Sequence, residues 1–425
     1  MKVVIVGNSA AAVGVVEAMR AHDQRAQIMM ISEEPHPIYS RPLLDHYLAA
    51  KIPRARLAYR SADFYTRHDV TPLLETRVVA LDTDARCVTT ADGRSIDYER
   101  LVICTGGAPI VPPVDGREAQ GVFTFARLGD IEGIDRLIAS QQVHSAVVVG
   151  AGMIGIKATD ALSRRGIRVT MLELAPRILS AALDDAASAI LAARLQSAGV
   201  DVRTGNTVTA INSTHGRVSS VTLQDGGELA AQLVVFGIGV RPNVALVSGT
   251  DIAVNRGIIV DRTMRTTVSD IYAAGDVAEA YDLVVDMNRI VAIWPNAYRQ
   301  GAIAGAQIVG LDAHDRGGVA MNAIEGQGLA AMAIGSANAE GAEYEVLCEG
   351  DPVAERYKRL VLQDGRLVGA ILVGQINRAG VYTGLIRTRM DVSAYRKQLM
   401  GDGFGLLSLP EHYRKHIVTG QGIEV

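Results

Sequence analysis

The segment Ser145–Gly155, with the sequence SAVVVGAGMIG, decides the fold of this chain. A short apolar run leads directly into the pattern Gly-x-Gly-x-x-Gly, a helix is predicted to about Arg165, and a strand follows at Arg168–Leu172. Glu173 closes the unit roughly 20 residues after the glycines. This order of strand, glycine turn, helix, strand and acid is the layout that binds a dinucleotide.

Each glycine of this turn has its own physical task. Gly150 permits the tight turn, Gly152 lets the backbone approach a pyrophosphate, and Gly155 lets the helix pack closely on the strand. Met153 and Ile154 begin the predicted helix, whose first N–H groups face the diphosphate. An ordinary glycine turn is the alternative, and the acid in its expected place argues against it.

A weaker copy of the same unit opens the chain. A strand at Lys2–Val6 leads into Gly7, an Ala-rich helix and a second strand follow, and Glu33 comes next. Ser9 and Ala12 stand where the second and third glycines belong, so a plain turn stays open here as the alternative. Both side chains are small enough for a close approach, and two copies indicate two nucleotides.

The composition indicates a globular α/β protein of two or three domains. Of 425 residues, 48% are hydrophobic, 43 are glycine and only 4% are aromatic, which suits Val/Ile-rich strands and Ala-rich helices. The net charge of −4 gives no sign of a nucleic-acid partner. No run reaches the roughly 18 apolar residues that span a membrane, and the apolar run Val3–Val6 is too short for a signal peptide. A cytoplasmic protein is expected.

The three cysteines, Cys87, Cys104 and Cys348, stand alone in the sequence. Without a Cys-x-x-Cys or similar spacing they exclude a four-cysteine zinc or iron–sulfur site within the chain, so no metal site is expected. They also argue against a secreted disulfide scaffold.

Further segments follow the two glycine turns in a fixed order. They are Leu101–Gly107 (LVICTGG), Phe236–Asn243 (FGIGVRPN), Thr267–Val277 with its Ala-Gly-Asp turn, and Trp294–Ala297 (WPNA). Together they resemble the pyridine nucleotide–disulfide oxidoreductase superfamily over essentially the whole chain. The resemblance implies an α/β fold with two Rossmann-like dinucleotide-binding domains: an FAD domain (residues 1–112 and 243–316) with an inserted NAD(H) domain (113–242). A C-terminal α+β interface domain (317–425) follows.

The resemblance also implies which residues contact each cofactor. Those expected at FAD are Gly7, Ser9, Ala12, Glu33, Arg41, Pro42, Thr105, Gly106, Gly275, Asp276, Trp294 and Ala297. Those expected at NAD are Gly150, Gly152, Met153, Ile154, Gly155, Glu173 and Gly239. Asp276 would accept a hydrogen bond from the ribityl or pyrophosphate region. Because a carboxylate at Glu173 repels a 2′-phosphate, NADH is expected over NADPH, a preference that the neighbouring Arg177 softens.

One departure from the family lies in Ile38–His46 (IYSRPLLDH), where many members carry a redox-active cysteine and this chain has none. Disulfide or peroxide reduction therefore lacks a working thiol, and Cys104, at the end of a buried strand, is expected to be an inert packing residue. The Tyr-Ser-Arg-Pro phrase instead resembles the branch of rubredoxin reductases, dioxygenase ferredoxin reductases and the flavin portion of NADH-nitrite reductase.

A second departure concerns charge. Members of that branch often pair a lysine shortly after Arg-Pro with a glutamate just past the second glycine motif, and here those positions hold His46 and Lys157. Catalytic roles are expected for Lys157, His46 and Arg41. A cation at Lys157 near the isoalloxazine would stabilise the anionic reduced flavin, with Asp45 as its charge partner. The alternative is that Lys157 points along its helix into solvent.

The branch implies that hydride passes between NAD(H) and flavin N5, and that single electrons pass to or from an iron–sulfur protein or subunit. Gly152–Ala158 and Asn377–Arg387 also resemble the flavin subunit of NADH-dependent phenylglyoxylate dehydrogenase, a multi-subunit 2-oxoacid oxidoreductase, so an oligomer or complex is expected. Two alternatives stay open: an NADH oxidase or diaphorase acting on small acceptors, and an NADH-sensing flavoprotein scaffold.

The C-terminal third departs from the nucleotide pattern. Tyr357–Leu362 and Leu367–Val373 flank an Asp-Gly pair, which predicts a β-hairpin. Basic residues gather after it, at Arg387, Arg389, Arg396, Lys397, Arg414 and Lys415. They form either a solvated surface or a docking face for an acidic iron–sulfur partner.

Overall fold

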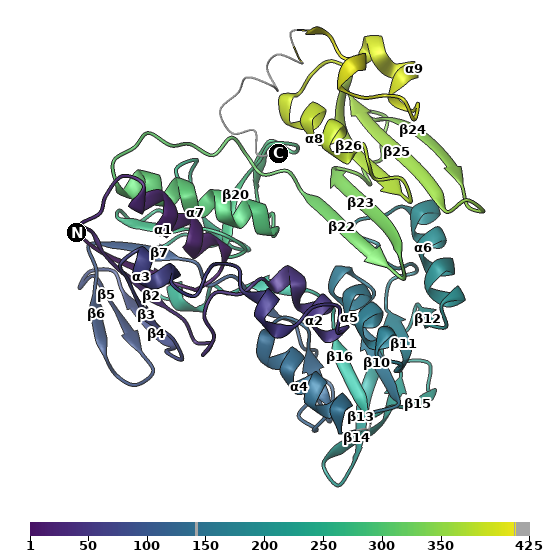
Figure 1. Cartoon of the computed structure of the whole chain (residues 1–425), viewed down its shortest axis with the longest axis horizontal. Coiled ribbons are helices and arrows are strands. Elements are labelled where there is room, and N and C mark those ends of the chain that lie inside the picture. Colours follow the sequence, from purple (N-terminus) through teal and green to yellow (C-terminus); the bar gives the residue numbers. More distant parts are fainter. Residues whose placement is uncertain (141–142, 412, 414–425) are drawn as a thin grey trace. The chain divides into compact units, whose positions relative to one another are not determined.

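The computed structural model describes residues 1–140, 143–411 and 413 of the chain (Figure 1). The chain divides into two compact units. Unit 1 comprises Met1–Leu174 and Gly199–Gly318, and unit 2 comprises Ala175–Ala198 and Val319–Val425. Within the described residues, none of the helices is long and apolar enough to cross a membrane.

The first sheet of unit 1 is parallel throughout, with the strand order β3-β2-β1-β7-β19. Its strands are β1 (Lys2–Val6), β2 (Gln27–Ile31), β3 (Val70–Leu73), β7 (Arg100–Ile103) and β19 (Ile271–Ala273). Strands β1, β7 and β19 are buried along nearly their whole length, which is why they read as apolar runs rather than as alternating patterns. Two helices, α1 (Ala10–Arg20) and α7 (Trp294–Ile308), pack against each other in this part of the unit (Figure 1).

The second sheet repeats the first. Its order is β12-β11-β10-β16-β9, again all parallel. The strands are β9 (Val122–Thr124), β10 (Ser145–Val149), β11 (Arg168–Glu173), β12 (Asp201–Thr204) and β16 (Leu233–Phe236). Helix α5 (Met153–Arg164) connects β10 to β11, and α4 (Leu128–Ala139) follows β9. The two sheets differ in their last strand, which comes late in the chain in the first sheet and early in the second.

Smaller elements complete unit 1. Antiparallel sheets branch from each Rossmann-like part: β4 (Val78–Asp82), β5 (Cys87–Thr90) and β6 (Ser95–Asp97), then β13 (Val208–Thr214), β14 (Arg217–Leu223) and β15 (Glu228–Ala230). Strands β18 (Ile258–Ile259), β20 (Ala278–Asp282) and β21 (Met287–Arg289) form another sheet, and α3 (Phe64–Arg67) precedes β3.

The chain passes between the two parallel sheets through one antiparallel pair, β8 (Gly107–Pro109) with β17 (Val240–Pro242). A short segment after β2, consisting of the 3₁₀ turn η1 (Arg41–Leu43) and helix α2 (Leu44–Leu48), lies against α4 and α5 (Figure 1). It therefore carries residues of the first Rossmann-like part onto the helices of the second.

Unit 2 is an antiparallel sheet covered by helices. The strand order is β22-β23-β26-β25-β24, made of β22 (Met321–Gly326), β23 (Leu329–Gly335), β24 (Glu345–Asp351), β25 (Arg356–Gln363) and β26 (Arg366–Val373). The predicted hairpin is β25–β26, with Asp364 and Gly365 both at positive φ in its turn. Helix α8 (Ala379–Thr388) packs on the sheet, and α9 (Arg396–Leu399) follows.

Helix α6 (Asp185–Ser197) also belongs to unit 2, although it lies between β11 and β12 in sequence. Asp184 caps its N-terminus and accepts hydrogen bonds from Tyr357 (2.5 Å) and Arg359 (3.4 Å) of β25. Arg359 is buried and also donates to two carbonyl groups, at Ala337 and Ala339. These buried polar contacts fasten α6 to the sheet of unit 2.

The predicted fold class is confirmed: two parallel Rossmann-like sheets precede an α+β part. The strands expected at Lys2–Val6 and Ser145–Val149 have those bounds in the structure. The expected domain limits of 1–112 with 243–316, 113–242 and 317–425 stay a prediction.

Candidate functional site

The first glycine turn is shaped by a close approach of two strands. Gly7 has a φ of +134°, and a Cβ there would lie 2.2 Å from the carbonyl oxygen of Cys104, so only glycine fits. Ser9 is the N-cap of α1 but its hydroxyl makes no capping hydrogen bond, and Ala12 is fully buried. The N–H groups at the start of α1 are therefore available to an anion, as a diphosphate requires.

A second turn lies beside this helix. Gly275 has a φ of +84°, its N–H donates to Oε1 of Gln300 (2.9 Å), and a Cβ on it would meet Ala11 and Ala297 at 3.3 and 3.4 Å. The packing brings Gly275, Asp276 and Ala297, all predicted FAD contacts, to the start of α1.

The carboxyl group of Asp276, in this turn, is half-buried. Burial raises its pKa, which the positive charge of Arg41 partly opposes. Among the described residues, none donates a hydrogen bond to it. A half-buried acceptor to which none of the described residues donates is open to a ligand with hydroxyl donors, such as the ribityl chain of FAD.

Thr105 and Gly106 lie at the junction of the two Rossmann-like parts. The Thr105 hydroxyl donates to the Asn243 carbonyl (2.8 Å), and the Asn243 N–H donates to the Gly106 carbonyl (2.9 Å). Both follow Cys104, whose carbonyl touches the Gly7 turn. The segments Leu101–Gly107 and Phe236–Asn243 thus meet beside the first glycine turn.

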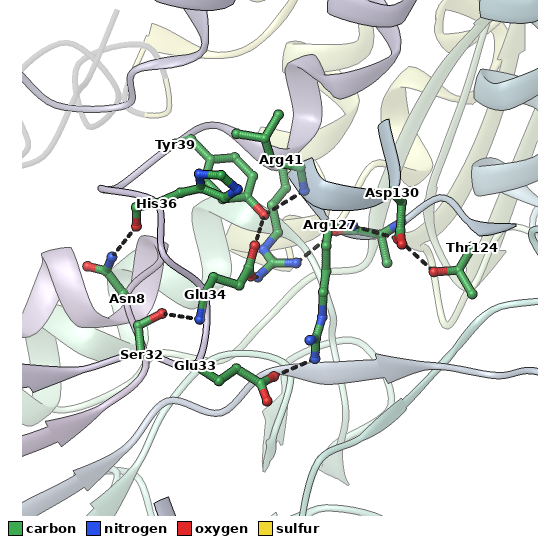
Figure 2. Close-up of polar contacts among 12 residues, drawn as sticks. Asn8, Ser32, Glu33, Glu34, His36, Tyr39, Arg41, Thr124, Arg127 and Asp130 are labelled. Carbon is green, nitrogen blue, oxygen red and sulfur yellow. Dashed lines mark hydrogen bonds and ion pairs between the residues drawn. The ribbon is translucent and has the colours of Figure 1, made fainter. Parts of the chain in front are cut away.

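The two acids after β2 are both engaged by basic residues (Figure 2). Glu33 pairs with Arg127 (2.5 Å), and Glu34 accepts hydrogen bonds from Tyr39 (2.8 Å) and Arg41 (2.6 Å). Sequence reasoning missed Arg127, since a contact between residues this far apart in the chain has no local signature.

The strand register shows which residue of the first unit corresponds to Glu173, the acid expected at the ribose of NAD. The N–H of Gly7 bonds to the Ile31 carbonyl, as that of Gly150 bonds to the Leu172 carbonyl. The residue in the position of Glu173 is therefore Ser32, and Glu33 lies one residue farther along.

Arg41, a predicted catalytic and FAD residue, is held by the protein itself. Besides Glu34, its guanidinium donates to the carbonyl of Ala126 (2.8 Å), at the start of α4 (Figure 2). Arg41 therefore links the segment after β2 to the second Rossmann-like part and reaches Asp276 through its charge.

The second glycine turn lies at the carboxyl ends of β10, β11 and β16. A Cβ on Gly155 would lie 1.8 Å from the Gly150 carbonyl oxygen, and Gly150 itself has a φ of +100°. Gly152 is the N-cap of α5, where Met153 and Ile154 form the first turn, and it has open space around it. These features leave the helix start accessible, as the motif predicts.

Two further predicted residues lie at this edge: Glu173 ends β11, and Gly239 follows β16. The Glu173 carboxylate accepts a hydrogen bond from the N–H of Ala151 (2.7 Å) inside the glycine turn. Gly239 has a φ of +115°, and its carbonyl accepts from the N–H of Ile110 (3.0 Å). Arg177, expected to soften the NADH preference, forms an ion pair with Asp185 (2.9 Å).

Lys157 is paired rather than solvated. Its ammonium group lies 3.4 Å from Oδ2 of Asp45 and donates to the Pro42 carbonyl (3.1 Å), and 29% of its side chain is exposed. His46 contacts the other carboxylate oxygen of Asp45 at 3.1 Å, with its ring more exposed. The expected Asp45 partner is confirmed, and Asp45 rather than His46 faces Lys157.

Two further predictions concern Cys104 and the basic residues near the C-terminus. Cys104 is buried, and burial raises the pKa of its thiol to about 12, as expected of an inert packing residue. Arg396 forms an ion pair with Glu345 of the edge strand β24. Arg414 and Lys415 lie outside the described residues, so the docking face stays a prediction.

Comparison with known proteins identifies the family. Residues 1–301 match the model of the pyridine nucleotide-disulphide oxidoreductases, and residues 321–390 match the C-terminal domain of rubredoxin NAD⁺ reductase. Subunit epsilon of the NADH-dependent phenylglyoxylate dehydrogenase of Aromatoleum evansii is 30% identical over 94% of this chain and 95% of its own length. The nitrite reductase [NAD(P)H] of Bacillus subtilis is 29% identical over 93% of the chain, which spans only 48% of that relative.

Solved structures agree. The covalent complex of putidaredoxin reductase with putidaredoxin matches with a TM-score of 0.85 and 28% identity, covering 98% of both chains. The resemblance read from the motifs is thereby confirmed. The chain belongs to the pyridine nucleotide-disulphide oxidoreductase family, whose members bind FAD and NAD(H), and is an FAD-dependent NAD(P)H oxidoreductase.

Proposed function

We propose that this protein passes electrons between NAD(H) and an iron–sulfur protein or subunit. The observation that carries the proposal is the pair of open helix starts in unit 1, each behind a glycine turn, with no reactive thiol beside the first. Relatives support it, since one is a subunit of an NADH-dependent dehydrogenase and another is a reductase solved with putidaredoxin. A narrower form of the proposal is that the electron-transfer partner is a subunit of a 2-oxoacid dehydrogenase complex of the phenylglyoxylate type.

The residues of the first turn would hold FAD and leave its ring system to do the redox chemistry. The chemistry that the bound cofactor would supply is hydride exchange with the nicotinamide and single-electron exchange with a partner. Gly7, Ser9 and Ala12 would admit the diphosphate at the start of α1, and Asp276 would accept from the ribityl chain. Glu33 would hold the adenosine ribose in competition with Arg127.

Glu173 would select the nicotinamide nucleotide. Its carboxylate is held in the glycine turn by the Ala151 N–H, where a 2′-phosphate would meet a fixed negative charge. We expect Glu173→Gln to raise the ratio of kcat/KM for NADPH to that for NADH by about tenfold, equivalent to about 1.4 kcal/mol. A ratio unchanged from the wild type would remove Glu173 from this role.

Lys157 would place a positive charge beside the flavin. We expect Lys157→Ala to lower the flavin midpoint potential or to slow reduction by NADH, because the cation favours the anionic reduced form. Arg203→Ala, which breaks the exposed pair of Arg203 with Asp201, is the matched control. If potential and reduction rate both match the wild type, Lys157 has no part in the reaction.

One experiment separates the proposed function from its rivals. The protein is isolated from its native cells together with any bound subunits, and the visible spectrum of the preparation shows whether it contains flavin and iron–sulfur clusters. NADH oxidation is then followed with rubredoxin or ferredoxin as the acceptor, and with oxygen alone. Rapid turnover with the iron–sulfur acceptor, or co-purifying clusters, supports the proposal. Equal turnover with oxygen alone indicates an oxidase, and a slow, long-lived NADH complex without turnover indicates a sensing scaffold.

A further inference from the structure

A cluster of polar and aromatic side chains lies beside Trp294, the only tryptophan of the chain. It joins Glu17 of α1, Tyr59 and Arg60 of the loop after the 3₁₀ turn η2 (Arg54–Leu57), and Tyr298 of α7. The Arg60 guanidinium binds both carboxylate oxygens of Glu17, at 2.6 and 3.0 Å, and the Tyr298 hydroxyl donates to Glu17 at 2.7 Å.

The charges of this cluster hold each other in place. Burial alone would raise the pKa of Glu17, but the hydrogen bonds from Arg60 and Tyr298 outweigh it and lower that pKa. Burial and the Glu17 contact raise the pKa of Tyr298 to about 12, so its hydroxyl stays a donor. The two-point Arg60–Glu17 pair fixes the guanidinium plane more firmly than a single contact does.

The fixed guanidinium of Arg60 packs against the aromatic ring of Tyr59. Its guanidinium lies over the ring of Tyr59 at 4.2 Å and near that of Tyr298 at 5.7 Å, and it also donates to the Tyr59 carbonyl (3.2 Å). The Tyr59 ring meets Trp294 edge to face, with centroids 5.0 Å apart and planes at 85°. No described residue accepts a hydrogen bond from the Trp294 indole, so packing orients that ring: the edge-to-face contact with Tyr59 and the hydrophobic core of unit 1 against which Trp294 lies.

Trp294 stands close to the proposed flavin site. It is the first residue of α7, and the next turn of this helix carries Ala297 and Gln300, which contact Gly275 beside Asp276. We propose that Tyr59 and Arg60 are positioning residues that fix the Trp294 ring at the flavin end of α7. This inference rests on the proposed FAD site and deepens it.

The test uses Trp294 as its own reporter. In the flavin-free protein we expect Arg60→Ala and Tyr59→Ala to increase acrylamide quenching and to lower the fluorescence anisotropy of the single tryptophan. Tyr59→Phe, which keeps the ring, and Arg67→Ala, which breaks the exposed pair with Asp63, should leave both signals unchanged. In the FAD-loaded protein the two alanine variants should slow reduction by NADH by about 5- to 30-fold, and Arg60→Lys should restore part of the rate.

The outcomes separate this inference from the proposed function. Unchanged tryptophan signals in both alanine variants overturn the positioning role. Altered tryptophan signals with wild-type flavin potential and reduction rate place Trp294 away from the flavin and also overturn it. If the proposed function itself is wrong, the defect appears in the wild-type protein, which would then lack a flavin spectrum or turnover with an iron–sulfur acceptor. Circular dichroism melting of each variant confirms that it is folded.

Discussion

The half-buried carboxyl group of Asp276 is harder to ionise in the folded protein than in the unfolded chain, and a ligand that donates hydrogen bonds to it would favour the charged form. Burial holds its folded pKa above the unfolded value of 3.8, so the flavin-free protein binds this proton more tightly than the unfolded chain does. The stability contributed by this group is present below pH 3.8 and is lost as the pH rises through the folded pKa. The same oxygen atoms are the acceptors that FAD hydroxyls would use.

Asp276→Asn should therefore have opposite effects on the two forms of the protein. The flavin-free variant should melt at a higher temperature than the wild type at pH 7, with the gain narrowing as the pH falls toward 3.8. Its affinity for FAD should fall by about 10- to 100-fold, because a hydrogen bond to a charged group is weakened. Calorimetry across pH and a flavin titration check both parts. A variant that binds FAD like the wild type would contradict the role of Asp276.

At this scale, chemistry that lies within one motif could be predicted and chemistry between distant segments could not. The sequence predicts Asp45 as the partner of Lys157 because Asp45 lies in the segment that the family resemblance places near the flavin, and the ion pair between them is present in the structure. The contact of Arg127 with Glu33 depends on where α4 begins relative to β2, which no local pattern encodes. For the same reason Ser32, rather than Glu33, occupies the position of Glu173.

At the scale of elements, helices α1 and α7 pack so closely that side chains would not fit between them. A Cβ on Gly301 would lie 1.9 Å from the Ala11 carbonyl oxygen, and one on Gly14 would lie 2.2 Å from that of Tyr298. This crossing sets the distance from the first glycine turn to Gly275 and Trp294. The strands and helices of each β–turn–α–β unit follow from local sequence, whereas this crossing joins segments from opposite ends of unit 1.

Gly301→Ala should destabilise the protein by about 1–3 kcal/mol, because the inserted methyl group must push the two helix backbones apart. FAD affinity should fall with it, since the turn residues shift. Gly380→Ala is the matched control: it lies in helix α8 with nothing within 4 Å of the added Cβ, and should stabilise by up to about 1 kcal/mol. Denaturant unfolding measures both, and equal stabilities would refute the close crossing.

At the scale of the whole molecule, each of the two units is built from two separate stretches of the chain. Helix α6 is expected from its position to belong with the second nucleotide motif, yet its contacts join it to the sheet of unit 2. The Asp184 contacts with Tyr357 and Arg359 bridge more than a third of the chain and could not be read from spacing. Breaking the buried Arg359–Asp184 pair should cost about 3–5 kcal/mol, because Asp184 keeps a buried charge with fewer donors.

The two units should therefore respond to different perturbations in calorimetry. FAD at about 100 times its Kd should raise the transition of unit 1, by up to about 2.7 kcal/mol of binding free energy, and leave that of unit 2 in place. Arg359→Met should lower only the transition of unit 2, whereas Arg396→Met, which breaks an exposed pair on the same unit, should shift it by about 0–1 kcal/mol. A single transition that moves with both FAD and Arg359→Met would mean that the units unfold together. In that case the units would be coupled, and the chain passes from one to the other at three places: Leu174–Ala175, Ala198–Gly199 and Gly318–Val319.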